Sequence, residues 1–304
     1  MEINNYMFNN YKNIAQGFKQ EKQSLKALKF FNKAYKYEEG KKDIELLIDI
    51  ALVYHELGQM KSAEKKYFEA LNIDSKESRV YYGLAILYDE ENDYDKAIKF
   101  YKKAIEFNPY YDRAYFFLAD IYDRIGDKKR AIQLYKKVIE IQPNDYWAYV
   151  NLGSIYEELN ENKTALDFMK KSLEIDPSHY MGLYNMGVIL KKIGLIDEAI
   201  NYYIEAIEQN PYFPSSFLNL AVIYKENKDY KKAIEIITKG IEFNSEVGYL
   251  FYNRACFFAC ENRLDEALND LTKAVDIYPN FIEYIKKDEE LKMVRNLEGY
   301  KKLQ

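Results

Sequence analysis

Few residues in this chain have side chains that commonly catalyse reactions or bind metals. The two cysteines, Cys256 and Cys260, are four residues apart, which would place them on adjacent turns of one helix face. A zinc site needs three or four ligands, and neither His55 nor His179 has a matching spacing. A disulfide between consecutive helical turns would constrain little and is not favoured in a reducing compartment. We therefore interpret the cysteines as packing residues and expect no metal; a redox or metal role is the alternative.

The sequence motifs of common active sites are also missing. Neither GxGxxG nor GxxxxGK[ST] occurs, so the sequence predicts no phosphate-binding loop. No serine or cysteine triad can be assembled from the spacing of the residues, and the abundant carboxylates single out no catalytic pair. We expect no catalytic residues, no cofactor and no enzymatic activity.

Asparagine is the residue type whose spacing does indicate chemistry. An amide side chain offers both a hydrogen-bond donor and an acceptor, so a row of amides can pair with the backbone of an extended peptide. Exposed apolar patches usually mark binding sites, and large apolar residues lie close to these asparagines in the sequence. The asparagines are Asn151, Asn185, Asn219 and Asn253, at intervals of 34 residues, and the apolar neighbours are Trp147, Tyr184, Leu218, Tyr249 and Tyr252.

The elements that would position these residues follow the same period. When each repeat is numbered so that a recurrent alanine is position 20, positions 4, 7, 8 and 11 share one helical face, and positions 20, 24 and 27 share another. A strict period of this length is the signature of a repeat array, here with two short amphipathic helices per unit. The recurrent alanines are Ala27, Ala63, Ala97, Ala131, Ala165, Ala199, Ala233 and Ala267.

Residues that end helices occur at fixed positions of the repeat. Position 15 holds glycine or asparagine in six units, and these residues tolerate the left-handed conformation that ends a helix. Position 32 holds proline in five units, where it separates one unit from the next. The residues are Gly58, Asn92, Gly126, Asn160, Gly194 and Asn262 at position 15, and Pro109, Pro143, Pro177, Pro211 and Pro279 at position 32.

This pattern resembles the tetratricopeptide repeat family, and the fifth unit shows it well with Tyr149, Leu152, Gly153, Tyr156, Ala165, Met169, Ser172 and Pro177. The resemblance implies an all-α, right-handed superhelical solenoid of helix-turn-helix repeats over residues 8–281. Eight repeats are predicted, with starts at Phe8, Ile44, Ser78, Asp112, Tyr146, Tyr180, Pro214 and Gly248. Residues 282–304 leave the pattern, and we predict a C-terminal capping helix there; a partner-binding amphipathic tail is the alternative.

The resemblance also implies where a ligand binds. In this family positions 2, 5, 6, 9, 12 and 13 of the first helix line a concave groove, and asparagine ladders at position 6 hold extended peptides in superhelical members. Asparagine is also common at position 6 of ordinary units, so a ladder that is only repeat consensus stays open. Lys191 and Lys225, at position 12, would favour an acidic part of the ligand, whereas acidic residues in the earlier repeats would favour a basic part.

Charge and hydropathy narrow the class of partner. The net charge of −5 is mild and no basic stripe is present, so nucleic acid is not favoured. The N-terminal residues show no signal peptide, and no apolar run approaches the 18 residues that a membrane span needs. We predict a cytoplasmic module that binds a protein or peptide, with no nucleic-acid or membrane partner. The alternative is a structural scaffold that self-assembles or organises a complex through its convex surface.

Overall fold

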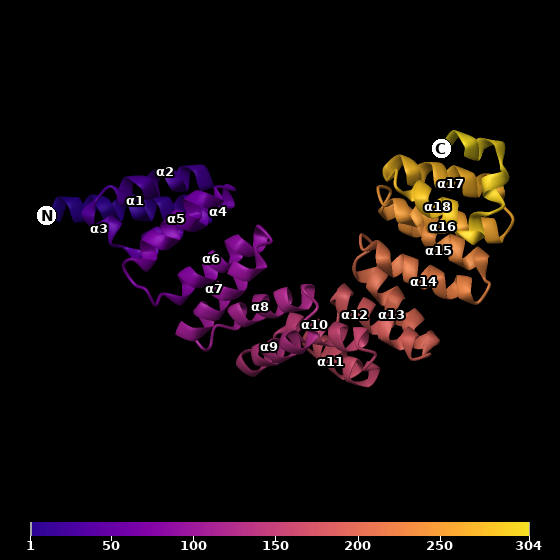
Figure 1. Cartoon of the computed structure of the whole chain (residues 1–304), viewed down its shortest axis with the longest axis horizontal. Helices are drawn as coiled ribbons and strands as arrows, with labels where there is room; N and C mark the ends of the chain where they lie inside the picture. Colours follow the sequence, from indigo (N-terminus) through magenta and orange to yellow (C-terminus); the bar gives the residue numbers. More distant parts are fainter. Residues whose placement is uncertain (1, 304) are drawn as a thin grey trace. The chain divides into compact units, whose positions relative to one another are not determined.

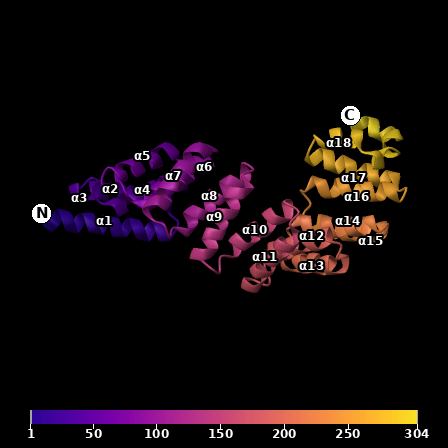
Figure 2. The same cartoon turned by 60° about the horizontal axis from the view of Figure 1, so that its bottom comes forward.

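The structure, a computed structural model, describes residues 2–303 and contains only helices, turns and loops over that range. The chain divides into two compact units, Met1–Ala148 and Tyr149–Gln304, which are considered separately below. Helices follow one another as antiparallel pairs joined by short turns (Figure 1). A second view of the same ribbon shows each pair from another side (Figure 2).

The first unit contains four helix pairs and one extra short helix. Its first pair begins six residues before the predicted start of the first repeat, and the short helix α3 forms where that repeat has two additional residues. The helices are α1 (Glu2–Gln20), α2 (Ser24–Tyr35), α3 (Glu38–Lys41), α4 (Ile44–Glu56), α5 (Met60–Leu71), α6 (Ser78–Glu90), α7 (Tyr94–Phe107), α8 (Asp112–Arg124) and α9 (Lys128–Ile141).

The second unit contains the remaining pairs and the C-terminal segment. The helix α10 (Tyr146–Glu158) begins just before the division between the units. It is followed by α11 (Asn162–Ile175), α12 (Tyr180–Lys192), α13 (Ile196–Gln209), α14 (Pro214–Glu226), α15 (Tyr230–Phe243), α16 (Gly248–Cys260) and α17 (Leu264–Ile277). From α4 to α16, the first helix of each pair starts at the residue where the sequence predicts a repeat to begin.

The turn inside each pair has the left-handed residue that position 15 predicts. Three glycines have φ between 71° and 84°, and three asparagines have φ near 60°. The same conformation occurs at Lys22 (φ 57°) and Lys228 (φ 61°), where the sequence has no residue suited to it. An aspartate next to the turn often caps the second helix: Asp93, Asp127 and Asp229 each accept a backbone N–H bond there.

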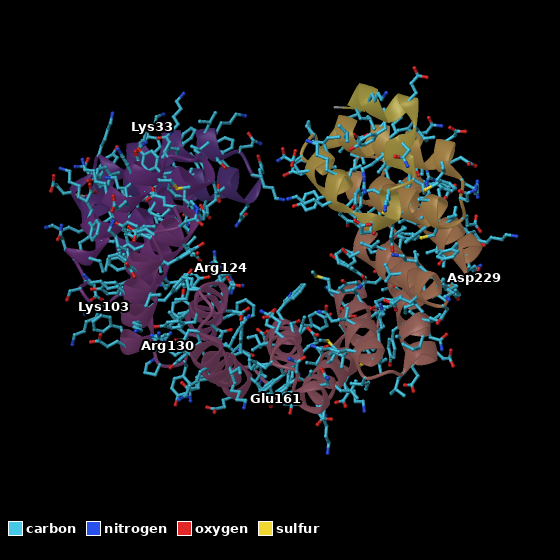
Figure 3. The ribbon with its side chains drawn as sticks, turned by 45° about the vertical axis from the view of Figure 1, so that its right-hand side comes forward. Lys33, Lys103, Arg124, Arg130, Glu161 and Asp229 are labelled. Atoms are coloured by element: carbon cyan, nitrogen blue, oxygen red, sulfur yellow. The ribbon has the colours of Figure 1, made fainter. Side chains whose placement is uncertain are left out.

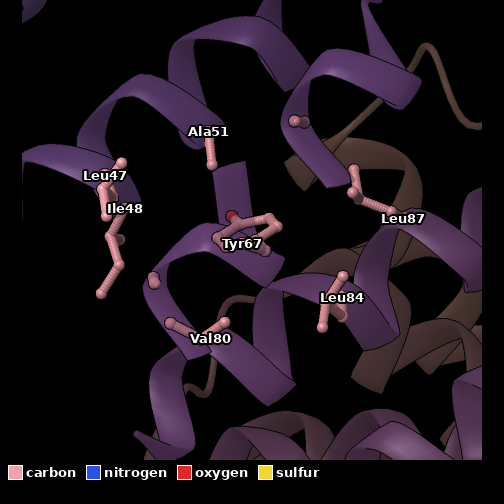
Figure 4. Close-up of a cluster of buried hydrophobic side chains, with 9 residues drawn as sticks. Leu47, Ile48, Ala51, Tyr67, Val80, Leu84 and Leu87 are labelled. Atoms are coloured by element: carbon pink, nitrogen blue, oxygen red, sulfur yellow. The ribbon is translucent and has the colours of Figure 1, made fainter. Parts of the chain in front are cut away.

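The core of each unit is built from the small and large residues that recur in phase. The alanines at position 20 are fully buried, and the aromatic rings at position 24 fill the space between helices. Figure 4 shows one such cluster, in which Tyr67 of α5 packs among Leu47, Ala51, Val80 and Leu84 from α4 and α6. Most of the tyrosines at position 24 are therefore architectural.

The C-terminal segment differs from the single capping helix predicted over residues 282–304. Helix α18 (Phe281–Lys287) ends after seven residues and is followed by three 3-10 helices, η1 (Glu289–Leu291), η2 (Val294–Asn296) and η3 (Glu298–Leu303). The side chain of Arg295 donates hydrogen bonds to the carbonyl oxygens of Ile285 and Asp288, which stabilises the chain reversal after α18. Ile285, Leu291, Val294 and Tyr300 are buried, and η2 and η3 contact α17. The segment thus covers the last pair without forming one continuous helix.

Candidate functional site

Adjacent repeats are joined by polar contacts on one face of their first helices. We call the side chains at positions 2, 5, 6, 9, 12 and 13 of the first helices the first-helix face. On this face, position 12 of one repeat forms an ion pair with position 13 of the next. The pairs are His55–Glu90 at 2.7 Å and Asp89–Arg124 at 2.5 Å in the first unit, and Glu157–Lys192 at 2.6 Å and Lys191–Glu226 at 2.9 Å in the second. Figure 3 labels Arg124 among the side chains.

These ion pairs change the expected role of the two lysines. Lys191 is bound to Glu226, and Lys225 lies 2.5 Å from Glu290 of the C-terminal segment. Both lysines therefore already have an intramolecular carboxylate partner. Solvent-exposed pairs of this kind contribute only about 0–1 kcal/mol, so a ligand carboxylate can replace the intramolecular partner at small cost. Their role in binding an acidic ligand stays a prediction.

The four asparagines at position 6 are half-buried but differ in their hydrogen bonds. The amide of Asn219 donates to the hydroxyl of Tyr184 at 3.0 Å and to that of Tyr203 at 3.5 Å. Tyr203 is position 24 of the preceding repeat and is fully buried, and burial raises the pKa of its hydroxyl. Asn219 therefore stabilises the interface between two repeats by satisfying a buried tyrosine.

Position 6 meets position 24 of the preceding repeat elsewhere as well. A Cβ atom at Gly83 would lie 2.3 Å from Cζ of Tyr67, so this tyrosine requires a glycine beside it. The ring of Phe117 stacks on that of Tyr101 with centroids 6.3 Å apart. The residue at position 6 thus fits the side chain at position 24 in both units.

Asn185 and Asn253 have no such partner. The preceding repeats have Met169 and Ile237 at position 24, which offer no hydroxyl group. Asn253 donates to the backbone oxygen of Tyr249, at 2.7 Å in its own helix. Within residues 2–303, the side chain of Asn185 forms no hydrogen bond. The interface between repeats therefore explains the asparagine at 219 and leaves the amide of Asn185 available.

The apolar residues predicted around the asparagines are less exposed than a large open patch would require. Tyr184, Leu218 and Tyr249 are half-buried, because first helices of adjacent repeats cover part of each side chain. The rings of Tyr184 and Phe213 meet edge to face at 5.1 Å. Trp147 is 42% exposed, and it belongs to the end of the first unit. The face in the second unit is therefore a mixed surface of amides and partly covered apolar groups.

The C-terminal segment occupies the last part of this face. The hydroxyl of Tyr252 donates to a carboxylate oxygen of Asp288 at 2.5 Å, and its ring stacks on Phe281. Burial, and then the hydrogen bond to Asp288, raise the pKa of Tyr252. With the Lys225–Glu290 pair, two predicted ligand-binding residues thus contact carboxylates of the C-terminal segment.

The cysteines lie beneath the same segment. Cys256 is buried with its Sγ 3.6 Å from Asp288, and Cys260 is half-buried. Burial raises the pKa of both thiols, which disfavours the reactive thiolate. Over the part of the chain that the structure describes, no cluster of three or more His, Cys, Asp or Glu side chains forms a metal site. No helix in that part has the length and apolar character to cross a membrane.

A pocket on the first-helix face of the first unit was not predicted. It has a volume of ≈ 350 Å³ between α4 and α6, with Ile48, Leu52 and Ile86 beside the rings of Tyr67 and Tyr82. The one sequence signal in its lining is Gly83, the one glycine at position 6, where the ring of Tyr67 takes the place that a side chain would occupy. This pocket has the size of sites that hold a small ligand or one anchoring side chain, and its lining combines these apolar groups with Glu45, Asp49 and Arg79.

Comparisons with known proteins agree with this architecture. Three sequence models, each described as tetratricopeptide repeat, match residues 78–111 and 180–213, residues 112–145, and residues 134–167 and 202–235. The last matches begin in the second helix of one pair, so they span the junction between repeats. Among curated proteins, none matches the chain.

Solved structures share the fold. A tetratricopeptide repeat protein from Parabacteroides merdae has a TM-score of 0.65 at 20% identity, over 83% of this chain and 99% of that one. MamA has a TM-score of 0.50 at 24% identity, over 55% and 91% of the two chains. YrrB, described as a TPR protein with an unusual peptide-binding site, has a TM-score of 0.51 at 25% identity, over 60% and 92%.

The helix pairs, their fixed period and the joined first helices define an all-α repeat protein of the solenoid class, as predicted. The chain belongs to the tetratricopeptide repeat family.

Proposed function

We propose that this protein is a non-catalytic module that binds an extended peptide segment of a partner protein on the first-helix face of the second unit. Proteins of this family generally mediate protein–protein interactions. The described peptide-binding site of YrrB supports the same class of ligand for this chain. The pocket beside Gly83 is a further candidate for an anchoring side chain. A cytoplasmic location stays a prediction.

The observation that carries the proposal is the amide of Asn185. It lies half-buried on the face, makes no intramolecular hydrogen bond among the described residues, and has no tyrosine hydroxyl to satisfy. A peptide backbone would supply the donor and acceptor that such an amide needs. Asn253 can take the same role with its acceptor oxygen, because only its N–H group is used within the helix. Asn219 contributes mainly by holding Tyr184 and Tyr203.

The test starts from peptides selected on the immobilised full chain from a random 12-residue library. Their dissociation constants are then measured for Asn185→Ala with Asn253→Ala, and for the control Asn201→Ala, which removes an exposed amide on α13. Each lost hydrogen bond is expected to cost about 1 kcal/mol, so the double variant should bind roughly 10- to 30-fold more weakly. Equal affinities for the double variant and the control would contradict the proposal.

A scaffold that self-assembles is the second candidate. The observation in its favour is an exposed aromatic pair, Tyr212 and Phe243, whose rings meet edge to face at 5.9 Å and are 71% and 45% exposed. Light scattering at increasing protein concentration distinguishes the two. Assembly that is lost in Tyr212→Ser with Phe243→Ser would favour the scaffold, whereas a monomer at all concentrations would exclude it.

A further inference from the structure

A second pocket lies away from the first-helix face of the first unit. Side chains of α7, α8 and α9 line an open pocket of ≈ 450 Å³, and none of these residues occupies a first-helix-face position. Leu118 and Tyr115 form part of an apolar floor, and three cations, Lys102, Arg130 and Lys137, surround it. No carboxylate lines the pocket, which makes it unusual on a chain with a net charge of −5.

Two of the three cations lie against one aromatic ring. The guanidinium of Arg130 lies 4.2 Å from the ring centroid of Tyr122 and donates to its hydroxyl at 3.1 Å, while Lys102 lies 5.9 Å from the same ring. Figure 3 labels Arg130 on its helix. Such cation–π contacts orient a cation without neutralising its charge. Tyr122 thus fixes two positive groups beside an apolar cavity.

The carboxylates near these cations are weak competitors for them. Asp127 lies 2.6 Å from Arg130, and Glu140 lies 2.7 Å from Lys137, each on or next to the same helix as its partner. Local pairs of this kind on an exposed helix surface are worth a few tenths of a kcal/mol, roughly. Lys102 forms no ion pair within residues 2–303. The cations therefore keep most of their capacity to bind an external carboxylate.

The second unit provides an internal comparison at the same repeat positions. The equivalent pocket between α13, α14 and α15 is lined by two lysines and two glutamates, and Glu235 pairs with both Lys232 and Lys239 at 3.1 Å. Ile204 stands where the first pocket has Lys102, and Glu235 stands where it has Gln133. Lys232 and Lys239 stand where the first pocket has Arg130 and Lys137, so repeat architecture explains the cavity and two of its cations. It does not explain Lys102 or the absence of a carboxylate from the first pocket.

We propose that the pocket between α7, α8 and α9 binds an acidic peptide segment of a partner, with an apolar side chain on the floor and flanking carboxylates on Lys102, Arg130 and Lys137. Charge complementarity selects this class of ligand, since the lining offers donors to anions and none of its side chains is a carboxylate. Lys102, Arg130 and Gln133 are exposed around the cavity, so a segment on a partner surface can reach it. The binding site is separate from the face proposed above and does not depend on it.

The test uses a fluorescein-labelled hexapeptide, Glu-Glu-Leu-Phe-Glu-Glu, and its lysine counterpart, Lys-Lys-Leu-Phe-Lys-Lys, in anisotropy titrations of the full chain. Wild type should bind the acidic peptide, more weakly as salt rises, and not the basic one. Lys102→Ile with Gln133→Glu, which copies the lining of the second pocket, should bind at least about tenfold more weakly. Ile204→Lys with Glu235→Gln should gain affinity, and Asn201→Ala, which removes an exposed amide on α13, should change nothing.

Two results would overturn the proposal. One is the absence of acidic-peptide binding by the wild type. The other is equal affinity for wild type and for Lys102→Ile with Gln133→Glu, provided that circular dichroism shows the same helicity for both.

Discussion

At the scale of single residues, position 6 has two roles that the repeat pattern does not separate. Asn219 meets a buried tyrosine hydroxyl of the preceding repeat, whereas Asn185 faces a repeat with a methionine there and makes no intramolecular bond. The same residue type is thus structural in one repeat and available for a ligand in another. The distinction follows from position 24 of the preceding unit.

Replacing the two asparagines should therefore have different effects on stability. Asn219→Ala would leave the buried hydroxyl of Tyr203 without this partner, and the free energy of unfolding should fall by about 1–3 kcal/mol. Asn185→Ala removes no internal bond, so its effect on stability should stay within about 0.5 kcal/mol. Urea unfolding followed by circular dichroism measures both. If Asn219→Ala costs as much in a Tyr203→Phe background as in wild type, the hydrogen bond is not the cause.

Replacing a lysine at position 15 with glycine should stabilise the protein. Lys228 has φ 61°, a conformation that costs a non-glycine residue about 1–2 kcal/mol. Lys228→Gly should raise the free energy of unfolding by about 1 kcal/mol, less the entropy that glycine adds to the unfolded chain. Gly194→Ala, where φ is 84°, should lower it. A stabilising effect of the alanine variant in thermal unfolding would contradict the interpretation that this position favours glycine.

At the scale of helices, the last repeat has an ion pair at positions where other repeats have apolar residues. Arg254 of α16 forms a bidentate ion pair with Asp270 of α17 at 2.7 and 2.8 Å and donates to Thr238 at 3.0 Å. The corresponding positions 7 and 23 hold aliphatic residues in the repeats that have pockets, such as Leu118 and Leu134. The ion pair is therefore a local substitute for apolar packing.

Single and double replacements of Arg254 and Asp270 should have non-additive effects on the free energy of unfolding. Asp270→Ala would leave the half-buried guanidinium of Arg254 without its carboxylate and should destabilise the chain by about 3 kcal/mol. Arg254→Leu with Asp270→Leu restores apolar packing and should be nearly neutral or stabilising. Denaturation midpoints of the single and double variants decide between these outcomes. A double variant as unstable as Asp270→Ala would show that the pair itself is required.

Variants of the C-terminal segment should change the affinity for a ligand on the first-helix face. Asp288 accepts a hydrogen bond from Tyr252, and Glu290 forms an ion pair with Lys225. Both partners are residues of the proposed binding face. Asp288→Asn with Glu290→Gln should release them and strengthen binding of the selected peptides by up to about fivefold, the equivalent of one surface ion pair. Glu289→Gln, an exposed neighbour, is the matched control. Equal affinities for both variants would mean that the segment does not compete with the ligand.

At the scale of the whole molecule, the fold could be predicted because it repeats. Each phase of the 34-residue period has a local physical reason, from the small residue at position 8 to the left-handed residue at position 15, and seven first helices begin where the period places them. The C-terminal segment could not be predicted in the same way, since it occurs once. Its reversal depends on a long-range bond from Arg295 to the end of α18.

The geometry of the candidate site could be predicted only in part. Position in the repeat identified the face, but the state of each side chain depends on a residue about 35 positions away, as in Lys191–Glu226 and Asn219–Tyr184. The two pockets of the first unit require three helices at once, so no single motif indicates them. Pairwise contacts between repeats are therefore the information that the sequence pattern lacks.

The central claim, that ligands lie on the first-helix face of the second unit, is tested most directly by photo-crosslinking. A benzophenone amino acid is placed at Met181 or Val222 on that face, and at Ile204 on α13 as the control. Each protein is irradiated with a peptide selected on the full chain, and the products are mapped by mass spectrometry. We expect crosslinks from Met181 and Val222 and none from Ile204. Crosslinks from Ile204 alone would contradict it.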